Sequence, residues 1–493
     1  MKTPVWLCVC WLMLSWSCSP QPEAPSETPP NIIFVMADDL GYGDLGCFGA
    51  KYIQTPVLDQ MAAEGIRLTQ HYAGTPVCAP ARAILMTGKH AGHAYVRGNM
   101  QAQYAPEPMR FPWGQLPLRT QDTTVAELLQ QAGYATGMIG KWGLGEYGTT
   151  GNPNEQGFDY FYGYTDQVLA HNSFPEYLLE NGEKVLLRNE VAYLDSNQWH
   201  RGRGSYATQK VDFSQDLFLD KSLAFIKQHQ AEPFFLYLPY TIPHDNGEAP
   251  AEDNYEVGDL GEYAEQDWTL EAKSYAAMIS RLDADIGRIQ SLLAELGLSE
   301  NTLIVFTSDN GPTKDPAISD FFDTNGPLRG YKRDLYEGGI REPFVAYWPG
   351  TIAPGQVSDH PSAFWDFLPT ACELAGLSIP AGTDGISYLP TLLGESQPKH
   401  EYLYWEFQAG KGPYQQAVIQ KGWKAIRFKD AERGIYSELY ELRADEGESE
   451  NLVDTHPEKL QELIQLMEMA SEPHPDGLFP NYDELMSEPN QQE

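Results

Sequence analysis

The sequence predicts an α/β protein: one large, mixed and mostly parallel sheet with helices on both faces, followed by a smaller antiparallel sheet with a helix. Short runs rich in β-branched and aromatic residues alternate with longer helical patterns through residues 31–395, which is typical of a sheet covered by helices. From about residue 396 the pattern changes to short strands broken by glycine and charge. The length of 493 residues, 42% of them apolar, is sufficient for one large domain and a smaller one.

The first strand of the large sheet is expected at residues 31–37, where NIIFVMA is almost wholly apolar. A helix then begins at Pro56 and ends before Gly65, because proline suits the first turn of a helix and glycine the position just past its end. A further buried strand is expected in PFFLYLPY, residues 233–240.

Two more helices each precede a strand. Thr124 and Glu127 form a capping-box pattern that starts one helix, and YATGMIG follows it as a strand over residues 134–140. Apolar residues recur at helical spacing over residues 270–296, which predicts a long amphipathic helix. It leads into the strand NTLIVFTS, residues 301–308.

The smaller C-terminal subdomain is expected over residues 396–475. YLYWEF, QAVIQKGWKAIRF and SELYELR read as short antiparallel strands, and a helix is expected near residues 456–470. The acidic, proline-containing stretch at 476–493 is predicted to be a surface tail.

The N-terminus resembles an export signal. Residues 1–18 carry Lys2 and then about a dozen apolar residues, too few to span a bilayer. Cys18 ends this run, and the proline-rich residues 19–30 read as an extended tether. This arrangement resembles a bacterial lipoprotein, in which the cysteine after the signal is lipidated. Trp16 stands where such signals usually have a small residue, so plain secretion is the alternative. The protein is therefore expected to be exported, as a periplasmic or cell-surface lipoprotein or in secreted form.

The charge of the chain argues against one class of partner. Lys and Arg total 33 against 69 Asp and Glu, which gives a formal net charge of −36. Nucleic acid is not an expected partner, because neutralising phosphates requires a surplus of cations. Membrane contact is expected only through a lipid on Cys18, because no apolar run of spanning length follows the signal.

The cysteines do not form a disulfide framework. Cys8 and Cys10 would leave with the signal, and the mature chain keeps Cys18, Cys47, Cys78 and Cys372. Whether Cys47 and Cys372 pair is left open by the sequence.

Polar side chains follow four of the expected strands. Ligand sites of open α/β sheets lie beyond the carboxyl ends of the strands, so these side chains are expected to meet if the four strands run parallel. They are Asp38, Asp39, Lys141, His244, Asp309 and Asn310. Three carboxylates and an amide oxygen form a hard donor set that suits Ca²⁺ or Mg²⁺ rather than zinc, and Ca²⁺ is the ion we expect.

The segment TPVCAPARAILMTGKH, residues 75–90, contains the most specific pattern. Cys78 precedes a short helix that ends at Gly88, so its sulfur lies at a helix N-terminus, where negative charge is favoured. The pattern CAPAR followed by Leu85, Thr87 and Gly88 is the signature of the formylglycine-dependent sulfatases, and the chain resembles that family. The segments NIIFVMADDLGYGDLGCFG, CAPAR, GKWGLG, TIPH, FTSDNG, GPLRGYKRDLYEGGIREP and ELYELRADEGESENL occur in the family's order.

The resemblance implies an alkaline-phosphatase-like core with a C-terminal subdomain, one Ca²⁺, and oxidation of Cys78 to formylglycine by a separate maturation enzyme. It implies that the Ca²⁺ ligands are Asp38, Asp39, Asp309, Asn310 and the formylglycine derived from Cys78. Arg82 would hold the hydrated aldehyde, Lys141 and Lys332 would bind the sulfate oxygens, and His244 would protonate the leaving oxygen.

One position departs from the family pattern. Many members have histidine two residues after the lysine, where it takes a proton as sulfate is eliminated, but this chain has Gly143 in GKWGLG. His171, in DQVLAHNSFPEYL, is the first candidate for the missing base, and His90 is the second.

The segments between the motifs suggest the substrate. His90, His93, Arg97, Asn99 and His171 supply polar groups able to bind a sugar, and these segments resemble sulfatases acting on sulfated galactans or related glycans. The expected function is hydrolysis of sulfate from a sulfated carbohydrate, of galactan or glycosaminoglycan type. The alternatives are a phosphomonoesterase or phosphodiesterase of the same superfamily, and a non-catalytic glycan-binding surface lipoprotein.

Overall fold

The computed structural model describes residues 29–100, 114–194, 204–408 and 412–487. The predicted signal peptide, Cys18 and most of the tether lie outside these ranges. Among the described residues, no helix combines the length and the apolar character needed to cross a membrane.

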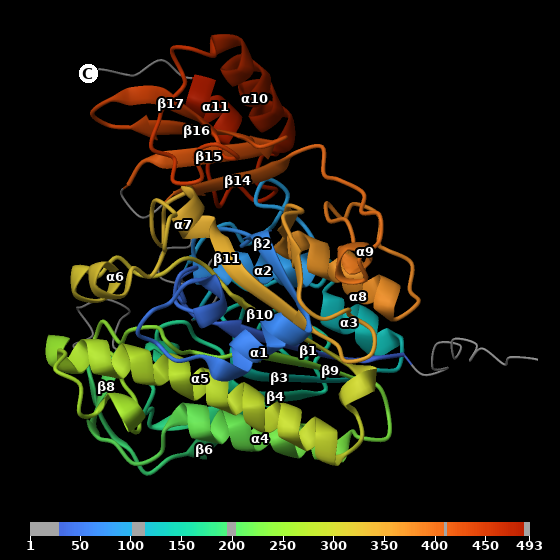
Figure 1. Ribbon diagram of the computed structural model, residues 1–493, viewed down its shortest axis with the longest axis vertical. Coiled ribbons are helices and arrows are strands. Elements are labelled where there is room, and N and C mark those ends of the chain that lie inside the picture. Colours follow the sequence, from blue (N-terminus) through green and yellow to red (C-terminus); the bar gives the residue numbers. More distant parts are fainter. Residues whose placement is uncertain (1–28, 101–113, 195–203, 409–411, 488–493) are drawn as a thin grey trace, which may run out of the picture.

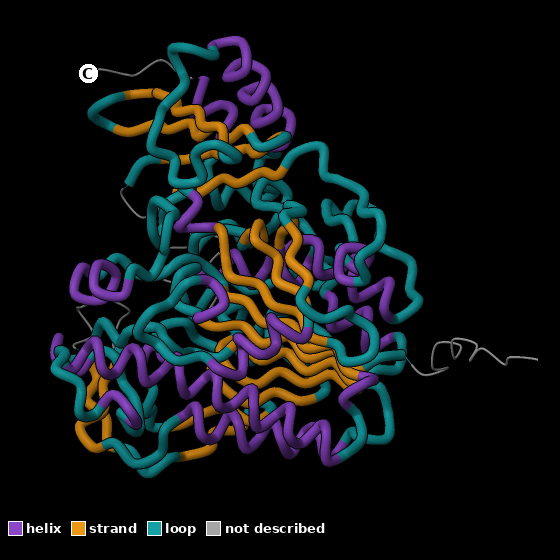
Figure 2. The backbone as a smooth tube through the Cα atoms, in the orientation of Figure 1, coloured by secondary structure: helices purple, strands orange, loops and turns teal. Residues whose placement is uncertain are grey.

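The larger domain is built on one eleven-stranded sheet, which lies between two sets of helices (Figures 1 and 2). From one edge to the other its strands are β12 (Gln356–Ser358), β2 (Ile66–Tyr72), β11 (Arg341–Tyr347), β10 (Thr302–Ser308), β1 (Asn31–Ala37), β9 (Phe234–Pro239), β3 (Ala135–Lys141), β4 (Tyr160–Tyr164), β5 (Tyr177–Glu180) and β6 (Glu183–Leu186), and β13 (Ser362–Ala363) pairs with β2. A separate two-stranded sheet consists of β7 (Glu190–Tyr193) and β8 (Ser205–Gln209).

The centre of this sheet is parallel, and its edges are mixed. β10, β1, β9, β3 and β4 are parallel neighbours, whereas β11 runs antiparallel to both β10 and β2, and β5 runs antiparallel to β4 and β6. This confirms the predicted mixed, mostly parallel sheet. All residues of β1 and β10 are buried, as expected for strands covered on both faces.

Alternate residues of β1 point to opposite faces of the sheet and contribute to two different apolar clusters. Ile33 and Val35 belong to the cluster beneath α1 (Pro56–Glu64), α4 (Ser214–Gln228) and α5 (Leu270–Glu295). Ile32 and Phe34 belong to the cluster beneath α2 (Cys78–Thr87), α3 (Val125–Gln131) and α8 (Phe367–Leu374). Both hydrogen bonds of the predicted capping box at Thr124 are present.

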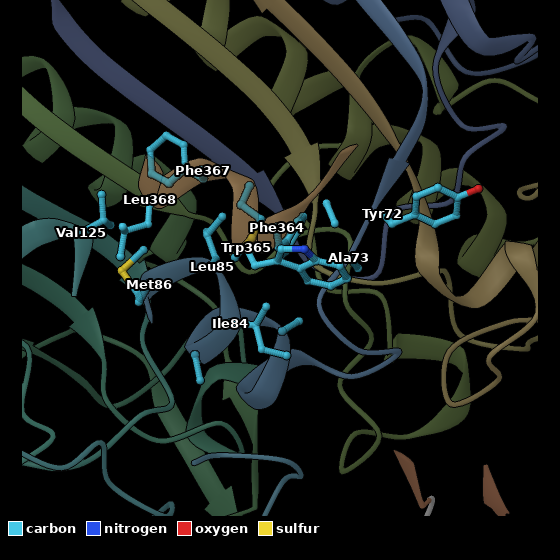
Figure 3. Close-up of a cluster of buried hydrophobic side chains, with 14 of the residues drawn as sticks. Tyr72, Ala73, Ile84, Leu85, Met86, Val125, Phe364, Trp365, Phe367 and Leu368 are labelled. Atoms are coloured by element: carbon cyan, nitrogen blue, oxygen red, sulfur yellow. The ribbon is translucent and has the colours of Figure 1, made fainter. Parts of the chain in front are cut away.

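Helix α2 is held rigidly because every one of its residues is buried. Figure 3 shows Ile84, Leu85 and Met86 beside the aromatic and aliphatic side chains of the segment that includes α8, among them Trp365 and Leu368. Gly88 ends the helix with a φ of 67°, a left-handed conformation that glycine adopts without strain. The packing of this helix fixes the position of its first residue, Cys78.

The smaller domain is the predicted antiparallel sheet with a helix, and it lies at the top of the molecule in Figure 1. Its strands, in order, are β14 (Leu403–Gln408), β15 (Tyr414–Gln420), β16 (Trp423–Asp430) and β17 (Gly434–Glu441), packed by α10 (Pro457–Ala470). The remaining helices of the chain are α6 (Pro316–Phe322), α7 (Glu337–Ile340), α9 (Leu389–Leu392) and α11 (Tyr482–Ser487).

A buried ion network joins the smaller domain to α7. Lys424 Nζ of β16 lies 2.9 Å from Glu337 Oε1 and 2.9 Å from Glu448 Oε1, and all three side chains are excluded from solvent. A buried charge is tolerated only when it is paired, so this network holds the two domains in register.

The structure differs from the predicted surface tail at 476–493. Within its described part, Tyr482 and Met486 of α11 are buried, and the Tyr482 ring packs on Tyr414 at a centroid distance of 5.9 Å. Lys429 Nζ donates to the carbonyl oxygen of Leu485. These apolar side chains pack against the small sheet, so the segment is not a free acidic tail.

The free cysteines of the described chain include Cys47 and Cys372. Cys47 packs against the cluster beneath α1, whereas Cys372 belongs to the cluster on the opposite face of the sheet. The sheet separates the two sulfurs, so these cysteines do not pair.

Candidate active site

The four strands that were expected to deliver polar groups do run parallel and lie side by side. Asp38 and Asp39 follow β1, Asp309 and Asn310 follow β10, and His244 comes shortly after β9. Lys141 is the last residue of β3 rather than the first residue after it. Their carboxyl ends therefore meet at one edge of the sheet, as the sequence predicts.

Cys78 lies against this edge as the first residue of α2, whereas the sequence predicts it just before the helix. Its Sγ is 3.5 Å from Asp38 Oδ1. One ligand atom each from Asp38, Asp39, Cys78 and His244 lies within 4.8 Å of the others. Burial raises the pKa of the Cys78 thiol to about 12, so the cysteine is not a thiolate nucleophile at neutral pH.

Three cations surround the carboxylates, and two of them, Arg82 and Lys141, are buried. Arg82, one turn along α2 from Cys78, has Nη2 at 2.8 Å from Asp309 Oδ2 and 3.3 Å from Asp38 Oδ2. Lys141 Nζ is 2.6 Å from Asp38 Oδ2. Lys332 Nζ is 2.6 Å from Asp39 Oδ2. The acidic protein thus contains a compact centre in which positive and negative groups are tightly paired.

The charges shift the pKa values of these carboxyls in opposite directions. Burial raises the pKa of Asp38, but the nearby Lys141, His244 and Arg82 outweigh it, and the net pKa lies well below its ordinary value. Burial and the neighbouring Asp38 charge raise the pKa of Asp309 to about 6. Like charges at close range favour a proton on one of them.

His244 is held in one tautomer by its neighbours. Its Nδ1 lies 2.6 Å from the carbonyl oxygen of Asp245 and donates to it. Its Nε2 therefore accepts from Lys332 Nζ at 3.0 Å. Burial and the Lys332 charge lower the pKa of His244 to about 4, so the ring is neutral in this arrangement.

The donor set fits a calcium ion. Asn310 Nδ2 donates to Asp39 Oδ1 at 2.7 Å and to the carbonyl oxygen of Gly311. Its own Oδ1 is buried and has no hydrogen-bond partner among the described residues. An amide oxygen without a partner beside Asp38, Asp39 and Asp309 is the oxygen-rich environment that Ca²⁺ binds. Asp39 has a φ of 63°, an uncommon conformation for a residue with a side chain, typical of functional sites.

Sequence reasoning missed one hydroxyl of this centre. Thr313 Oγ1 donates to Asp39 Oδ2 at 2.8 Å. Its place in the loop after FTSDNG is the only signal in the sequence, and threonine in a loop has too many ordinary roles to be chosen from it.

The segment HAGHAYVRGN does not bring all of its polar residues to the site. After Gly88 the chain turns back along α2, and Asn99 Oδ1 accepts the backbone N–H of Ala79 at 3.1 Å, next to Cys78. His90 lies beyond the other end of a ten-residue helix, about 15 Å from Cys78 at 1.5 Å per residue.

His90 and His93 form a separate cluster with Asp384. Their rings stack at a centroid distance of 4.2 Å, and His93 Nδ1 lies 2.9 Å from Asp384 Oδ1. The N–H of Gly92 donates to His90 Nδ1. His90 is therefore too far from Cys78 to be the missing base, and the two histidines do not line the catalytic centre as expected.

The prediction for Arg97 is also wrong. Its guanidinium is buried and pairs with Glu406 Oε1 of β14 at 2.7 Å. It also donates to the carbonyl oxygens of Gly92, Ala94 and Glu472. These bonds use four of the five N–H donors of a buried guanidinium, so Arg97 ties the two domains together and is not directed at the sulfate site.

His171 does lie at the site. Its ring stacks on His244 at a centroid distance of 4.7 Å and an interplanar angle of 13°. Its Nδ1 lies 3.0 Å from Glu248 Oε2. Glu248, which no motif of the sequence singles out, thus forms a carboxylate–imidazole pair beside the predicted general acid.

Comparisons with known proteins agree with this geometry. The sulfatase family model matches residues 30–377, and a model of the C-terminal region of N-sulphoglucosamine sulphohydrolase matches residues 330–472. Arylsulfatase A of Homo sapiens is 34% identical over 476 residues, which cover 89% of this chain and 87% of the relative. The N-acetylgalactosamine-6-O-sulfatase of Bacteroides thetaiotaomicron is 31% identical over 509 residues, covering 89% and 92%.

A solved structure shows the same architecture. A Bacteroides thetaiotaomicron protein, described in connection with the metabolism of multiple glycosaminoglycans, superimposes with a TM-score of 0.73 at 27% identity. The match covers 90% of this chain and 99% of that one. With the strand-end acids, the buried cations and Cys78 at the start of α2, these matches establish that the chain belongs to the sulfatase family, as a sulfuric ester hydrolase of the alkaline phosphatase superfamily.

Proposed function

We propose that this sulfatase removes sulfate from a sulfated carbohydrate by means of a formylglycine made from Cys78 and a bound Ca²⁺. The observation that carries the proposal is the position of Cys78, at the N-terminus of a buried helix and within 4.8 Å of Asp38, Asp39 and His244. A separate maturation enzyme would carry out the oxidation of Cys78.

The calcium ion would be held by Asp38, Asp39, Asp309 and Asn310 together with the modified residue 78. When bound, it supplies positive charge that stabilises a hydroxyl oxygen as a nucleophile for the sulfur atom.

The three cations of the site have distinct tasks in this proposal. Arg82 donates toward the hydrated side chain at position 78 and holds it in place. Lys141 and Lys332 bind the sulfate oxygens and stabilise the charge that develops as the ester bond breaks. Lys141 is buried and only 11% of the Lys332 side chain is exposed, and away from bulk water electrostatic interactions are stronger.

His244 is the proposed general acid. Its Nδ1 is fixed by the carbonyl oxygen of Asp245, so Nε2 is the atom that delivers a proton to the leaving sugar oxygen. The negative charge of a bound sulfate ester raises the pKa of His244 from its low value and favours a proton on Nε2.

His171 is the proposed acceptor for the proton that is lost as sulfate departs, in place of the histidine absent at Gly143. Its pairing with Glu248 and its stacking on His244 support this role. Replacement of His171 by alanine is expected to leave sulfate attached to the enzyme, detectable by intact-protein mass spectrometry. Turnover equal to that of the wild type would exclude the role.

The relatives support a proposal for the substrate class. One is an N-acetylgalactosamine-6-O-sulfatase, and a matching structure belongs to glycosaminoglycan metabolism. A sulfated galactan or glycosaminoglycan-like fragment is the proposed substrate. Export of the protein, as a lipoprotein anchored through Cys18 or in secreted form, would place it where such polysaccharides occur.

The test combines mass spectrometry with paired assays. The Cys78 peptide from the native host is expected to carry formylglycine, and the enzyme is expected to cleave 4-nitrophenyl sulfate much faster than 4-nitrophenyl phosphate. The Cys78→Ala variant is the matched inactive control. An unmodified thiol with no sulfate release would overturn the proposal, and faster cleavage of the phosphate would identify a phosphomonoesterase.

A further inference from the structure

Gln167 is a buried polar residue that the proposed mechanism does not use. It follows β4, and only 4% of it is exposed. Both Nε2 and Oε1 are buried, and neither has a hydrogen-bond partner among the described residues. Burying a carboxamide without partners is unfavourable, so this arrangement is expected where a bound molecule completes the hydrogen bonds.

The space that Gln167 occupies depends on Gly143. A Cβ atom at position 143 would lie 1.7 Å from Gln167 Nε2 and 2.6 Å from its Cδ. No side chain at position 143 is compatible with Gln167 in this position. The two residues therefore form a matched pair: the glycine that departs from the family pattern leaves room for the carboxamide.

This pair lies next to the catalytic centre. Gly143 is two residues beyond Lys141, whose Nζ contacts Asp38, and Arg82 Nη1 donates to the carbonyl oxygen of Lys141 at 2.5 Å. The β3–β4 pairing continues past the strand ends, because the N–H of Gly143 donates to the carbonyl oxygen of Thr165. Gln167 comes two residues after Thr165, and its carboxamide lies beside Gly143.

The loop after β4 gives Gln167 a defined direction. Asp166 Oδ1 accepts the N–H groups of Val168 and Leu169, and a single 3-10 turn follows over Leu169–His171. His171, at the end of this turn, stacks on His244. Gln167 therefore lies between Gly143, which its carboxamide approaches, and the paired imidazoles of the active site.

The chemistry of a carboxamide selects its ligand. Sulfate ester oxygens only accept hydrogen bonds, so they would satisfy Nε2 and leave Oε1 without a donor. A hydroxyl group both donates and accepts, and it would satisfy both atoms. Lys141 and Lys332 already provide donors for the sulfate. The two unpaired atoms of Gln167 therefore match a hydroxyl of the sugar rather than the sulfate itself.

We propose that Gln167 is a specificity-determining residue that hydrogen-bonds a sugar hydroxyl adjacent to the sulfate ester. The inference rests on the proposed carbohydrate sulfatase function. It assigns a substrate contact to a residue that no motif marks, in the space that Gly143 provides.

The test compares a sugar substrate with one that has no hydroxyl beside the sulfate. The Gln167→Met variant keeps the length of the side chain and removes its hydrogen bonds. The sugar probes are N-acetylgalactosamine 6-sulfate, galactose 6-sulfate and galactose 4-sulfate, and the one that the wild type desulfates fastest is used. With this sugar, the kcat/KM of Gln167→Met is expected to be about tenfold lower than that of the wild type. For 4-nitrophenyl sulfate it is expected to change less than twofold. Gln167→Ala, with its smaller side chain, serves as the second variant.

A binding measurement separates this inference from the chemistry of turnover. In the Cys78→Ser background, titration calorimetry with Ca²⁺ present is expected to show about tenfold weaker binding of the same sugar sulfate when Gln167 is replaced by methionine. Gln416→Met, a change to a buried glutamine of β15 remote from the site, is the matched control. It is expected to leave both the ratio of the two substrates and the binding constant unchanged.

The outcomes are distinguishable. Equal losses on the sugar and the aryl sulfate, no loss on either, or a wild type that cleaves only the aryl sulfate would each overturn the role of Gln167. If the wild type releases no sulfate from any probe, the proposed function fails. The calorimetric comparison of Gln167→Met with its parent then still shows whether Gln167 contacts the sugar.

Discussion

The pairing of Gly143 with Gln167 makes a prediction that needs no substrate. Replacement of Gly143 by alanine is expected to destabilise the protein strongly, and prior removal of the Gln167 side chain is expected to abolish most of that loss. The assay is a double-mutant cycle on the free energy of unfolding.

Two separate costs make up the expected loss. Gly143 has a φ of 78°, and a residue with a Cβ pays about 1–2 kcal/mol in this left-handed conformation. The Cβ would lie 1.7 Å from Gln167 Nε2, and relieving such an overlap in a packed interior costs about 1–3 kcal/mol. Gly143→Ala is therefore expected to cost about 2–5 kcal/mol in the wild type but only about 1–2 kcal/mol beside Gln167→Ala.

Gly133 is a control for the backbone cost alone. It has a φ of 87°, and a Cβ at that position would meet no atom of the described residues within 4 Å. Urea unfolding at pH 7.5, followed by tryptophan fluorescence, is measured for Gly133→Ala and for the four members of the cycle. If Gly143→Ala costs the same with and without the Gln167 side chain, to within about 0.5 kcal/mol, the steric argument is refuted.

Three further predictions concern stability and metal binding. Arg97→Met is expected to cost about 3–5 kcal/mol in urea unfolding, because it leaves the Glu406 carboxylate buried without its partner; Arg97→Met/Glu406→Gln should recover part of the loss. Burial lowers the pKa of His71 to about 3, so its contribution to stability is complete above the unfolded-state pKa of about 6.5 and is lost as pH falls toward 3. His71→Leu is expected to flatten this part of the stability–pH curve. Ca²⁺ at roughly 100 times its Kd is expected to stabilise the protein by about 3 kcal/mol, an effect reversed by EGTA and reduced in Asp309→Asn.

Each of these three has a result that contradicts it. If the folded Arg97→Met protein turns over substrate more slowly than the wild type, Arg97 has a role in the active site. An unchanged acid limb in His71→Leu would show that the buried imidazole titrates normally. If Ca²⁺ leaves the melting temperature unchanged, the carboxylates at the strand ends do not bind it.

The sequence predicts well which side chains meet at the catalytic edge of the sheet, because the order and direction of the strands determine this. Asp38, Asp309 and His244 each follow an apolar strand, and the carboxyl ends of neighbouring parallel strands must meet at one edge. Cys78 is recognisable for a similar reason, since a helix start next to that edge can be read from the residues around it.

The sequence predicts poorly what depends on the path of a loop or on a distant partner. The turn at Gly88 sends His90 away from the site and returns only Asn99 to it. The partner of Arg97 is Glu406, 309 residues away, and no local pattern reveals that pairing. Gln167 has no signature of its own, and the only signal was the unexpected glycine at position 143.

The position of β1 at the centre of the sheet also constrains how the chain folds as it is synthesised. Its neighbours are β9 and β10, and Asn31 pairs with Thr302 at a sequence separation of 271. At a synthesis rate of 5–20 residues per second, roughly 10–40 s pass between the emergence of β1 and that of its first partner, β9. For that time an almost wholly apolar strand has no edge to pair with. Such long-range pairing is slow, so the new chain depends on protection from aggregation until nearly half of it has been made.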